Sequence, residues 1–173
     1  MGPALPRLRR CMRDDTVGKT DGSEIIFRPA RREDVARIVE LLADDPLGAG
    51  RERFEDPLPE AYYAAFDRIE ASDGNILTVA ELDGAVVGCL QMTFIPGLSN
   101  QGADLALIEG VRVDTTLRSR GLGAQLIAHA LDAARARGCQ AVELFTHKSR
   151  TDAHRFYDRL GFEQSHVGYR IRL

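Results

Sequence analysis

A glycine-rich turn between a strand and a long helix constrains this chain most. The segment Leu105–Val113 is rich in aliphatic and β-branched residues, and the turn Arg118-Ser-Arg-Gly-Leu-Gly123 follows it. Apolar residues then recur at helical spacing to about Arg137, and Ala141–Thr146 is again β-rich. A strand, a helix and a second strand in this order form a crossover, which makes the two strands parallel. The chain is therefore predicted to be α/β, with a mixed central sheet.

Other segments of the sequence predict further strands of this sheet and helices that pack on it. Further strands are expected from β-rich composition at 25–28, 76–82 and 85–95, and further helices from apolar spacing at 35–42 and around 62–69. Asp83-Gly84 is a strong hairpin signal between two of these strands. The proline-rich segment 46–59 is too long for a mere connection and is expected to be a functional surface loop. Helices are expected on both faces of the sheet.

The end of the chain is predicted to add one helix and one or two strands. Ser149 and Asp152 form a candidate capping box for a short helix that Gly161 ends. The segment 162–173 is then expected to close the sheet.

Length and composition limit the domain count and the class of partner. The chain has 173 residues, which suits one domain, here expected at 24–173. Residues 1–23 show no periodicity and are expected to be a disordered or loosely docked tail. A formal net charge of −3 argues against a nucleic-acid binder, and no apolar run approaches the roughly 18 residues of a membrane span.

The three cysteines favour a reducing compartment. Cys11, Cys89 and Cys139 cannot all pair with one another, and they lack metal-ligand spacing. Free thiols and a cytoplasmic location are expected, and no metal site is expected.

The turn itself has the chemistry of an anion cradle. Unpaired amides and the helix dipole at a helix start attract an anion, Gly121 and Gly123 let it approach the backbone, and Arg118 and Arg120 add charge. The same spacing also suits an ordinary glycine-rich turn. A nucleotide P-loop is excluded because no Gly-Lys-Ser/Thr occurs, and Leu126 breaks the dinucleotide fingerprint.

The order of several motifs resembles the GNAT superfamily of acetyl-CoA-dependent N-acetyltransferases. The resemblance spans about residues 25–173 and includes Ile26-Phe-Arg-Pro-Ala30, the Asp83-Gly84 hairpin, the Arg-x-x-Gly-x-Gly turn and Ala153-His-Arg-Phe-Tyr157 with Gly161-Phe162. It implies a GNAT-like sheet and acetyl-CoA as co-substrate. The final quarter, with Asp152–Tyr157 and Glu163–His166, is similar to aminoalkylphosphonate acetyltransferases.

The resemblance also implies which residues bind the cofactor. The diphosphate is expected on the amides of residues 119–124, and the pantetheine arm along the backbone of the strand that ends at 111–113. The expected cofactor-binding residues are Val111, Arg112, Val113, Arg118, Ser119, Arg120, Gly121, Leu122, Gly123, Ala124 and Arg150. Arg150 departs from the family pattern, because many relatives carry an asparagine in that region.

Two residues are expected to move protons. Glu109 stands four residues before Val113, where polyamine-acetylating relatives carry a carboxylate, and it is expected to be the general base, through a water. Tyr157 stands at the family's tyrosine that protonates the thiolate. The N–H of Val111 or of Val113 is the expected oxyanion donor. The alternatives are a surface or salt-bridged glutamate and a core aromatic.

The acceptor is expected to be a primary amine of a small molecule, attacked directly in a ternary complex. An amine on a protein is an alternative, as is a non-catalytic acyl-CoA-binding regulatory module. A homodimer is expected because relatives often pair through sheet edges or C-terminal strands.

Overall fold

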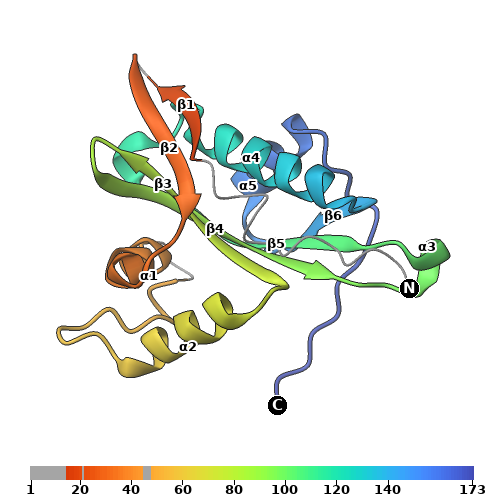
Figure 1. Cartoon of the computed structure of the whole chain (residues 1–173), viewed down its shortest axis with the longest axis horizontal. Coiled ribbons are helices and arrows are strands. Elements are labelled where there is room, and N and C mark those ends of the chain that lie inside the picture. Colours follow the sequence, from red (N-terminus) through yellow and green to blue (C-terminus); the bar gives the residue numbers. More distant parts are fainter. Residues whose placement is uncertain (1–14, 21, 45–47) are drawn as a thin grey trace, which may run out of the picture. The chain divides into compact units, whose positions relative to one another are not determined.

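The strands of this protein form one sheet and come from most of the length of the chain. The computed structural model describes residues 15–20, 22–44 and 48–173, and within them six strands follow the order β1-β2-β3-β4-β5-β6 (Figure 1). Their bounds are Thr16–Thr20, Ser23–Pro29, Asn75–Leu82, Ala85–Ile95, Leu105–Val113 and Ala141–Leu144. Neighbouring strands from β1 to β5 pair antiparallel, and β6 follows β5 through a helix, as the crossover predicts.

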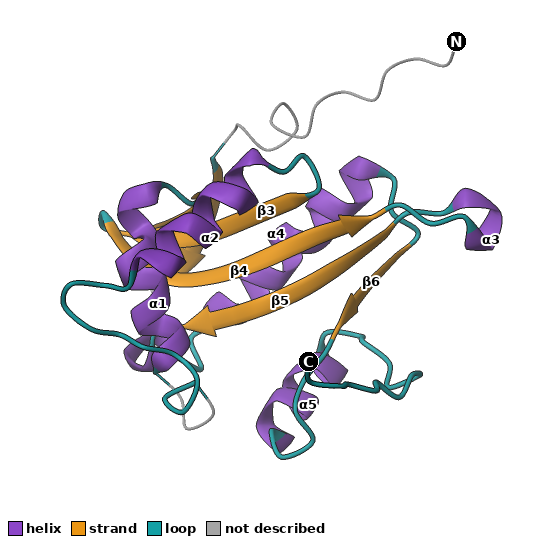
Figure 2. Cartoon of the chain, turned by 90° about the horizontal axis from the view of Figure 1, so that it is seen from below, coloured by secondary structure: helices purple, strands orange, loops and turns teal. Residues whose placement is uncertain are grey.

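Helices lie on both faces of this sheet. The α-helices among the described residues are α1 (Val35–Ala43), α2 (Glu60–Ala71), α3 (Ser99–Gly102), α4 (Leu122–Arg137) and α5 (Thr151–Arg159). Figure 2 shows α1 and α2 on one face of the strands β3 to β5, and α4 on the other. The prediction of an α/β fold with helices on both faces is confirmed.

Strand β4 is buried on both sides because it lies between the two helical layers. Cys89 packs with Ile38 and Leu41 of α1. The next residue, Leu90, points to the opposite face because side chains alternate along a strand. That face packs against α4, where Leu126 is also fully buried. The near-continuous apolar sequence of β4 follows from this position.

A buried ion network fixes the turn from β2 into α1. The Arg28 guanidinium contacts the Asp34 carboxylate at 2.7 and 3.1 Å and Glu81 Oε2 at 2.7 Å. Asp34 Oδ2 also accepts the Arg31 backbone N–H at 2.7 Å. Arg28 and Asp34 are both buried, so this network holds the start of α1 against β2 and β3.

Most predicted elements are confirmed with small shifts of their ends. At the β3–β4 hairpin, Asp83 and Gly84 have φ values of 50° and 80°, the pair of left-handed residues that a type I′ turn needs. Gly138 ends α4 in the left-handed region, with a φ of 81°. The segment 48–59 holds no helix or strand, as the loop prediction requires.

The structure corrects the predicted N-terminal tail. Residues 16–20 form β1, which pairs antiparallel with β2 from Thr16 opposite Phe27 to Thr20 opposite Ser23. The segment contains a single aliphatic side chain, Val17, so it has no hydrophobic alternation to reveal a strand. Residues 1–14 of the predicted tail, and Cys11 with them, lie outside the described residues.

Two predictions for the end of the chain are wrong. No strand forms in the described segment 162–173, because a strand needs a partner ladder and none pairs with it here. The Ser149/Asp152 capping box is also absent: Arg150 is the N-cap of α5, with no side-chain cap bond. The Ser149 hydroxyl instead contacts His147 Nδ1 at 2.7 Å.

The chain forms two compact units, one ending at Glu143 and one comprising Leu144–Leu173. A single domain over 24–173 stays a prediction. None of the helices in the described ranges is long and apolar enough to cross a membrane.

Candidate active site

A β-bulge interrupts the ladder between β4 and β5. Cys89 lies opposite Arg112 and Gln91 lies opposite Glu109, so two residues of β5 face the single residue Leu90. Gly110 takes up the extra length with a φ of +61°, a conformation that glycine adopts without steric strain. The bulge therefore turns the backbone between Glu109 and Val111 away from the regular ladder.

Glu109 is exposed to solvent. Its side chain is exposed, on the face of the sheet that it shares with its cross-strand partner Gln91. Among the described residues no cation forms an ion pair with Glu109, which argues against a salt-bridged glutamate. Gln91 belongs to a hydrogen-bonded polar group on β3 and β4, in which Asn75 Oδ1 accepts from both Gln91 and Thr93.

The bulge also orients the predicted oxyanion donor. The Cys89 thiol donates to the Gly110 carbonyl, with 3.6 Å between sulfur and oxygen. The C=O and N–H of a trans peptide point in opposite directions, so the Val111 N–H points away from Cys89. Burial raises the pKa of the Cys89 thiol to about 12, although the charges of Arg112 and Arg37 oppose the shift. Cys89 therefore stays a thiol and a donor at neutral pH.

The predicted anion cradle is open in the structure. We call residues 118–123 the anion loop. Ser119 and Gly121 have φ values of +65° and +81°, and α4 begins at Leu122. The amides of Ser119 and of residues 121–124 donate to no other backbone group of the described chain. A Cβ built on Gly121 would meet nothing within 4 Å, so its outer side is accessible. Free amides at the start of a 16-residue helix fit a diphosphate.

Arg118 anchors the anion loop to its surroundings. Its guanidinium donates to the Val113 carbonyl at 3.4 Å and to the Asp44 carbonyl at 3.3 Å. These bonds tie the loop to the end of β5 and to the end of α1. The structure thus gives Arg118 a supporting role, and the predicted contact of its charge with the cofactor stays a prediction.

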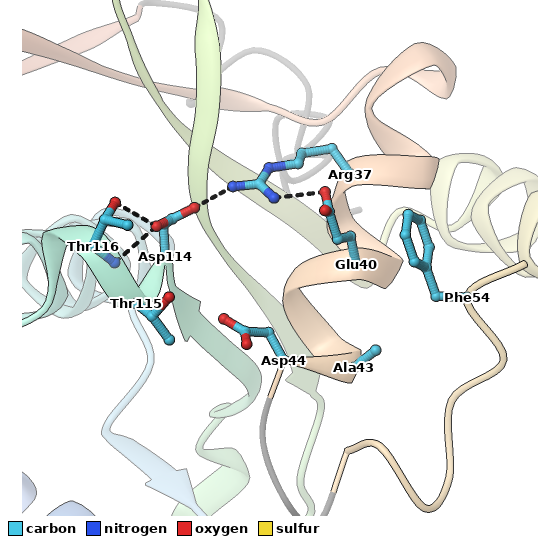
Figure 3. Close-up of a pocket in the computed structure, with 8 residues that line it drawn as sticks. All are labelled: Arg37, Glu40, Ala43, Asp44, Phe54, Asp114, Thr115 and Thr116. Carbon is cyan, nitrogen blue, oxygen red and sulfur yellow. Dashed lines mark hydrogen bonds and ion pairs between the residues drawn. The ribbon is translucent and has the colours of Figure 1, made fainter.

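A cavity of about 410 Å³ lies beside this anchor (Figure 3). Its lining comes from α1, the loop before α2 and the segment after β5: Arg37, Glu40, Ala43, Asp44, Phe54, Asp114, Thr115 and Thr116. Arg37 forms ion pairs with Glu40 and Asp114, and the Asp114 carboxylate also accepts the Thr116 amide at 2.9 Å. The hydrogen bonds from Thr116, more than the charge of Arg37, hold the pKa of Asp114 below its ordinary value.

Sequence reasoning missed this cavity. Arg37, Glu40 and Asp44 are spaced three and four residues apart, so they lie on one face of α1. That charged stripe is visible in the sequence. The pairing of Arg37 with Asp114, which completes the cavity wall, cannot be read from the sequence, because Asp114 comes 77 residues after Arg37.

The second unit carries the predicted proton donor, Tyr157. Tyr157 lies on α5, with ring centroids 5.1 Å from Phe156 and 5.7 Å from Phe162, both edge-on. It is half-buried in this aromatic group. Arg150, at the start of the same helix, donates its backbone N–H to the His147 carbonyl at 2.9 Å. The roles of Tyr157 and Arg150 toward a cofactor stay predictions.

Comparison with known proteins gives a consistent set of relatives. The model of the Acetyltransferase (GNAT) family matches residues 35–162. Aminoalkylphosphonate N-acetyltransferase of Salmonella typhimurium is 34% identical over 146 residues, which are 80% of this chain and 94% of that protein.

Two solved structures are similar over the same region. A crystal structure described as a transcriptional regulator from Bacillus halodurans is 44% identical with a TM-score of 0.84, covering 86% of this chain and 99% of the other. An acetyltransferase from Trypanosoma brucei is 26% identical with a TM-score of 0.70, covering 86% of this chain and 99% of the other.

Proposed function

This chain belongs to the GNAT family of acetyltransferases, and from that membership we propose that it transfers acetyl from acetyl-CoA to a primary amine of a small molecule. The observation that carries the proposal is the group of amides at 119 and 121–124, which donate to no backbone group of the described chain and lie at the start of α4, together with the exposed carboxylate of Glu109 on β5. The family resemblance expected from the sequence is confirmed.

The residues of the first unit fit the cofactor in two ways. The amides of residues 119 and 121–124 and the dipole of α4 favour a diphosphate. The Val111 N–H at the bulge, which points away from Cys89, fits the carbonyl oxygen of a thioester. Together these groups would hold the two ends of the pantetheine arm of acetyl-CoA, the diphosphate and the thioester, with the arm along residues 111–113.

We assign each proton of the transfer to a residue of this chain. Acetyl-CoA supplies the thioester carbonyl and a thiolate leaving group. As the amine nitrogen bonds to the carbonyl carbon, Glu109 accepts the proton that nitrogen loses, through a water. The Val111 N–H stabilises the oxygen that becomes negative. The carbon–sulfur bond then breaks, and Tyr157 donates its phenolic proton to the sulfur.

A small acceptor is favoured by the relative of known activity. The Salmonella protein carries an aminoalkylphosphonate activity in its name, and its alignment reaches far beyond the final quarter in which the sequence suggested it. A protein amine is the second acceptor class. The proposal also includes a cytoplasmic location and a homodimer, and it includes no nucleic-acid partner.

The relative named as a transcriptional regulator favours a second candidate, a non-catalytic module that binds acyl-CoA and regulates other molecules. A pure binder has no need of a base and an acid. Tyr157→Phe tests the assigned acid, because phenylalanine keeps the ring packed on Phe156 and Phe162 but loses the phenolic proton. For an enzyme, turnover should fall about 10²- to 10⁴-fold while the melting temperature and coenzyme A affinity hold. A core-aromatic role predicts unchanged turnover.

The primary test is an acetyl-transfer screen. The protein is mixed with acetyl-CoA and a panel of small amines, including aminoalkylphosphonates, and with peptides, and thiol release and acetylated product are measured. Gly121→Glu is the control, because its carboxylate would occupy the diphosphate position. The expected result is amine-dependent thiol release that this variant loses. Tight coenzyme A binding without transfer to any amine would favour the regulatory module.

A further inference from the structure

The N-terminal strand β1 lies against the start of α4, although it precedes the region that matches the family (Figure 1). Gln125, in the first turn of α4, pairs with both backbone groups of Lys19. Its Oε1 accepts the Lys19 N–H at 3.1 Å, and its Nε2 donates to the Lys19 carbonyl at 2.8 Å. A side-chain amide thus replaces a neighbouring strand at the open edge of β1.

Gly18 makes this close approach feasible. A Cβ at Gly18 would lie 2.3 Å from Gln125 Oε1 and 3.0 Å from the Phe27 ring. No side chain fits there without moving the glutamine. The contact between β1 and α4 is therefore built into the sequence of both elements.

Thr20, at the end of β1, reaches the anion loop itself. Its hydroxyl donates to the Arg120 carbonyl at 3.3 Å, and the residue is only 7% exposed. The Arg120–Gly121 peptide is trans, so the Gly121 N–H points to the side opposite Thr20. Glycine allows a peptide plane beside it to rotate easily, so a bond to the carbonyl restricts the direction of that N–H.

We propose that β1 is a strap that holds the anion loop in place. In this strap Thr20 is a positioning residue that directs the Gly121 N–H toward the diphosphate of coenzyme A. Arg118 holds the same loop from the other flank, through the ends of β5 and α1. The strap rests on the proposed function, since it acts only if the loop binds a diphosphate. It extends the cofactor site to a segment outside the family match.

The test compares three variants of β1. Thr20→Val removes the donor and keeps the shape, so the Kd for coenzyme A by calorimetry and the KM for acetyl-CoA should rise about 3- to 10-fold. Thr20→Ser keeps the hydroxyl and should bind like the wild type. Thr16→Val makes the same change at an exposed position of the same strand and should have no effect.

A truncated donor separates positioning from general damage. S-acetylpantetheine has no diphosphate, so its kcat/KM should be the same in Thr20→Val and in the wild type. Gln125→Ala, which loosens the strap without touching Thr20, should weaken coenzyme A binding in the same way. Equal losses with both donors, or unchanged coenzyme A affinity in a folded Thr20→Val, would overturn the strap. A wild type that binds no coenzyme A would instead overturn the proposed function.

Discussion

Glu109 is the residue whose chemistry the proposed mechanism depends on most. Glu109→Gln keeps the size of the side chain but cannot accept a proton, so kcat/KM should fall about 10²- to 10⁴-fold. The loss should shrink at high pH, where more of the amine is already neutral. The matched control is Glu33→Gln, an exposed carboxylate just before α1, which should leave the rate unchanged. A negligible or pH-independent loss at Glu109 would give it a structural role.

Thr78 offers a test of packing that is independent of function. Thr78 lies in β3, and its hydroxyl is fully buried with no hydrogen-bond partner among the described residues. Valine has nearly the same shape and no polar atom, so Thr78→Val should raise the free energy of unfolding by about 1 kcal/mol. Thr93→Val is the control, because its hydroxyl contacts Asn75 Oδ1 at 2.8 Å.

Urea unfolding distinguishes the two threonines. Thr93→Val should lower the free energy of unfolding by about 1 kcal/mol, opposite in sign to Thr78→Val. Destabilisation by both substitutions would mean that the Thr78 hydroxyl has a partner after all.

At the scale of elements, the entry into α1 depends on one carboxylate. Burial alone would raise the pKa of Asp34, but hydrogen bonds from Arg28 and from the Arg31 N–H outweigh it and bring the pKa below its ordinary value. Asp34→Asn leaves Arg28 buried with only Glu81, so the free energy of unfolding should fall by about 3–5 kcal/mol at neutral pH.

The sign of the pH dependence follows from the lowered pKa. The stabilisation by Asp34 is complete above its unfolded pKa of about 4, and it is lost as pH falls through the lower folded value. Wild type and Asp34→Asn should therefore converge in acid. Asp132→Asn is the control, since Asp132 and its partner Arg135 are 75% and 71% exposed and contribute under about 1 kcal/mol. A constant gap between wild type and Asp34→Asn would refute the assignment.

Elements with a strong local pattern could be predicted from the sequence. The hairpin at Asp83-Gly84 and the cap at Gly138 follow from residues that are adjacent in the chain. Gly110 inside β5 is also a local signal for a bulge, although the register that makes it one comes from β4. By contrast, β1 was not predicted, although it pairs with the adjacent β2 and the sequence between them is Asp21-Gly22, itself a local hairpin signal. Its contact with Gln125, 106 residues away, has no local signal.

The same distinction applies to the candidate site. The anion loop was predictable because one hexapeptide contains its glycines and the helix start. Its supports were not, since Thr20 and Asp44 come from distant segments and act through single hydrogen bonds. The carbonyl of Gly110 and the thiol of Cys89 likewise meet only when β4 and β5 pair.

At the scale of the whole molecule, the apolar pattern of residues 167–173 predicts that two copies of this chain associate. Val167, Tyr169, Ile171 and Leu173 alternate with polar residues and are all largely exposed. Such a period-2 apolar pattern is typical of a strand with one buried side, and although this segment forms no strand within the chain, its unpaired backbone groups could pair with the sheet edge of another chain. A second copy of this chain offers a self-complementary partner, so we expect a homodimer.

Light scattering tests this association directly. The wild type should have twice the chain mass of 19.1 kDa at working concentration. The double variant Tyr169→Lys and Ile171→Lys places charge on the apolar face and should be a monomer, because burying unpaired lysines is unfavourable. The matched variant Arg170→Gln and Arg172→Gln changes the intervening positions and should remain a dimer. A monomeric wild type would contradict the prediction, and a dimer that tolerates the lysines would place the interface elsewhere.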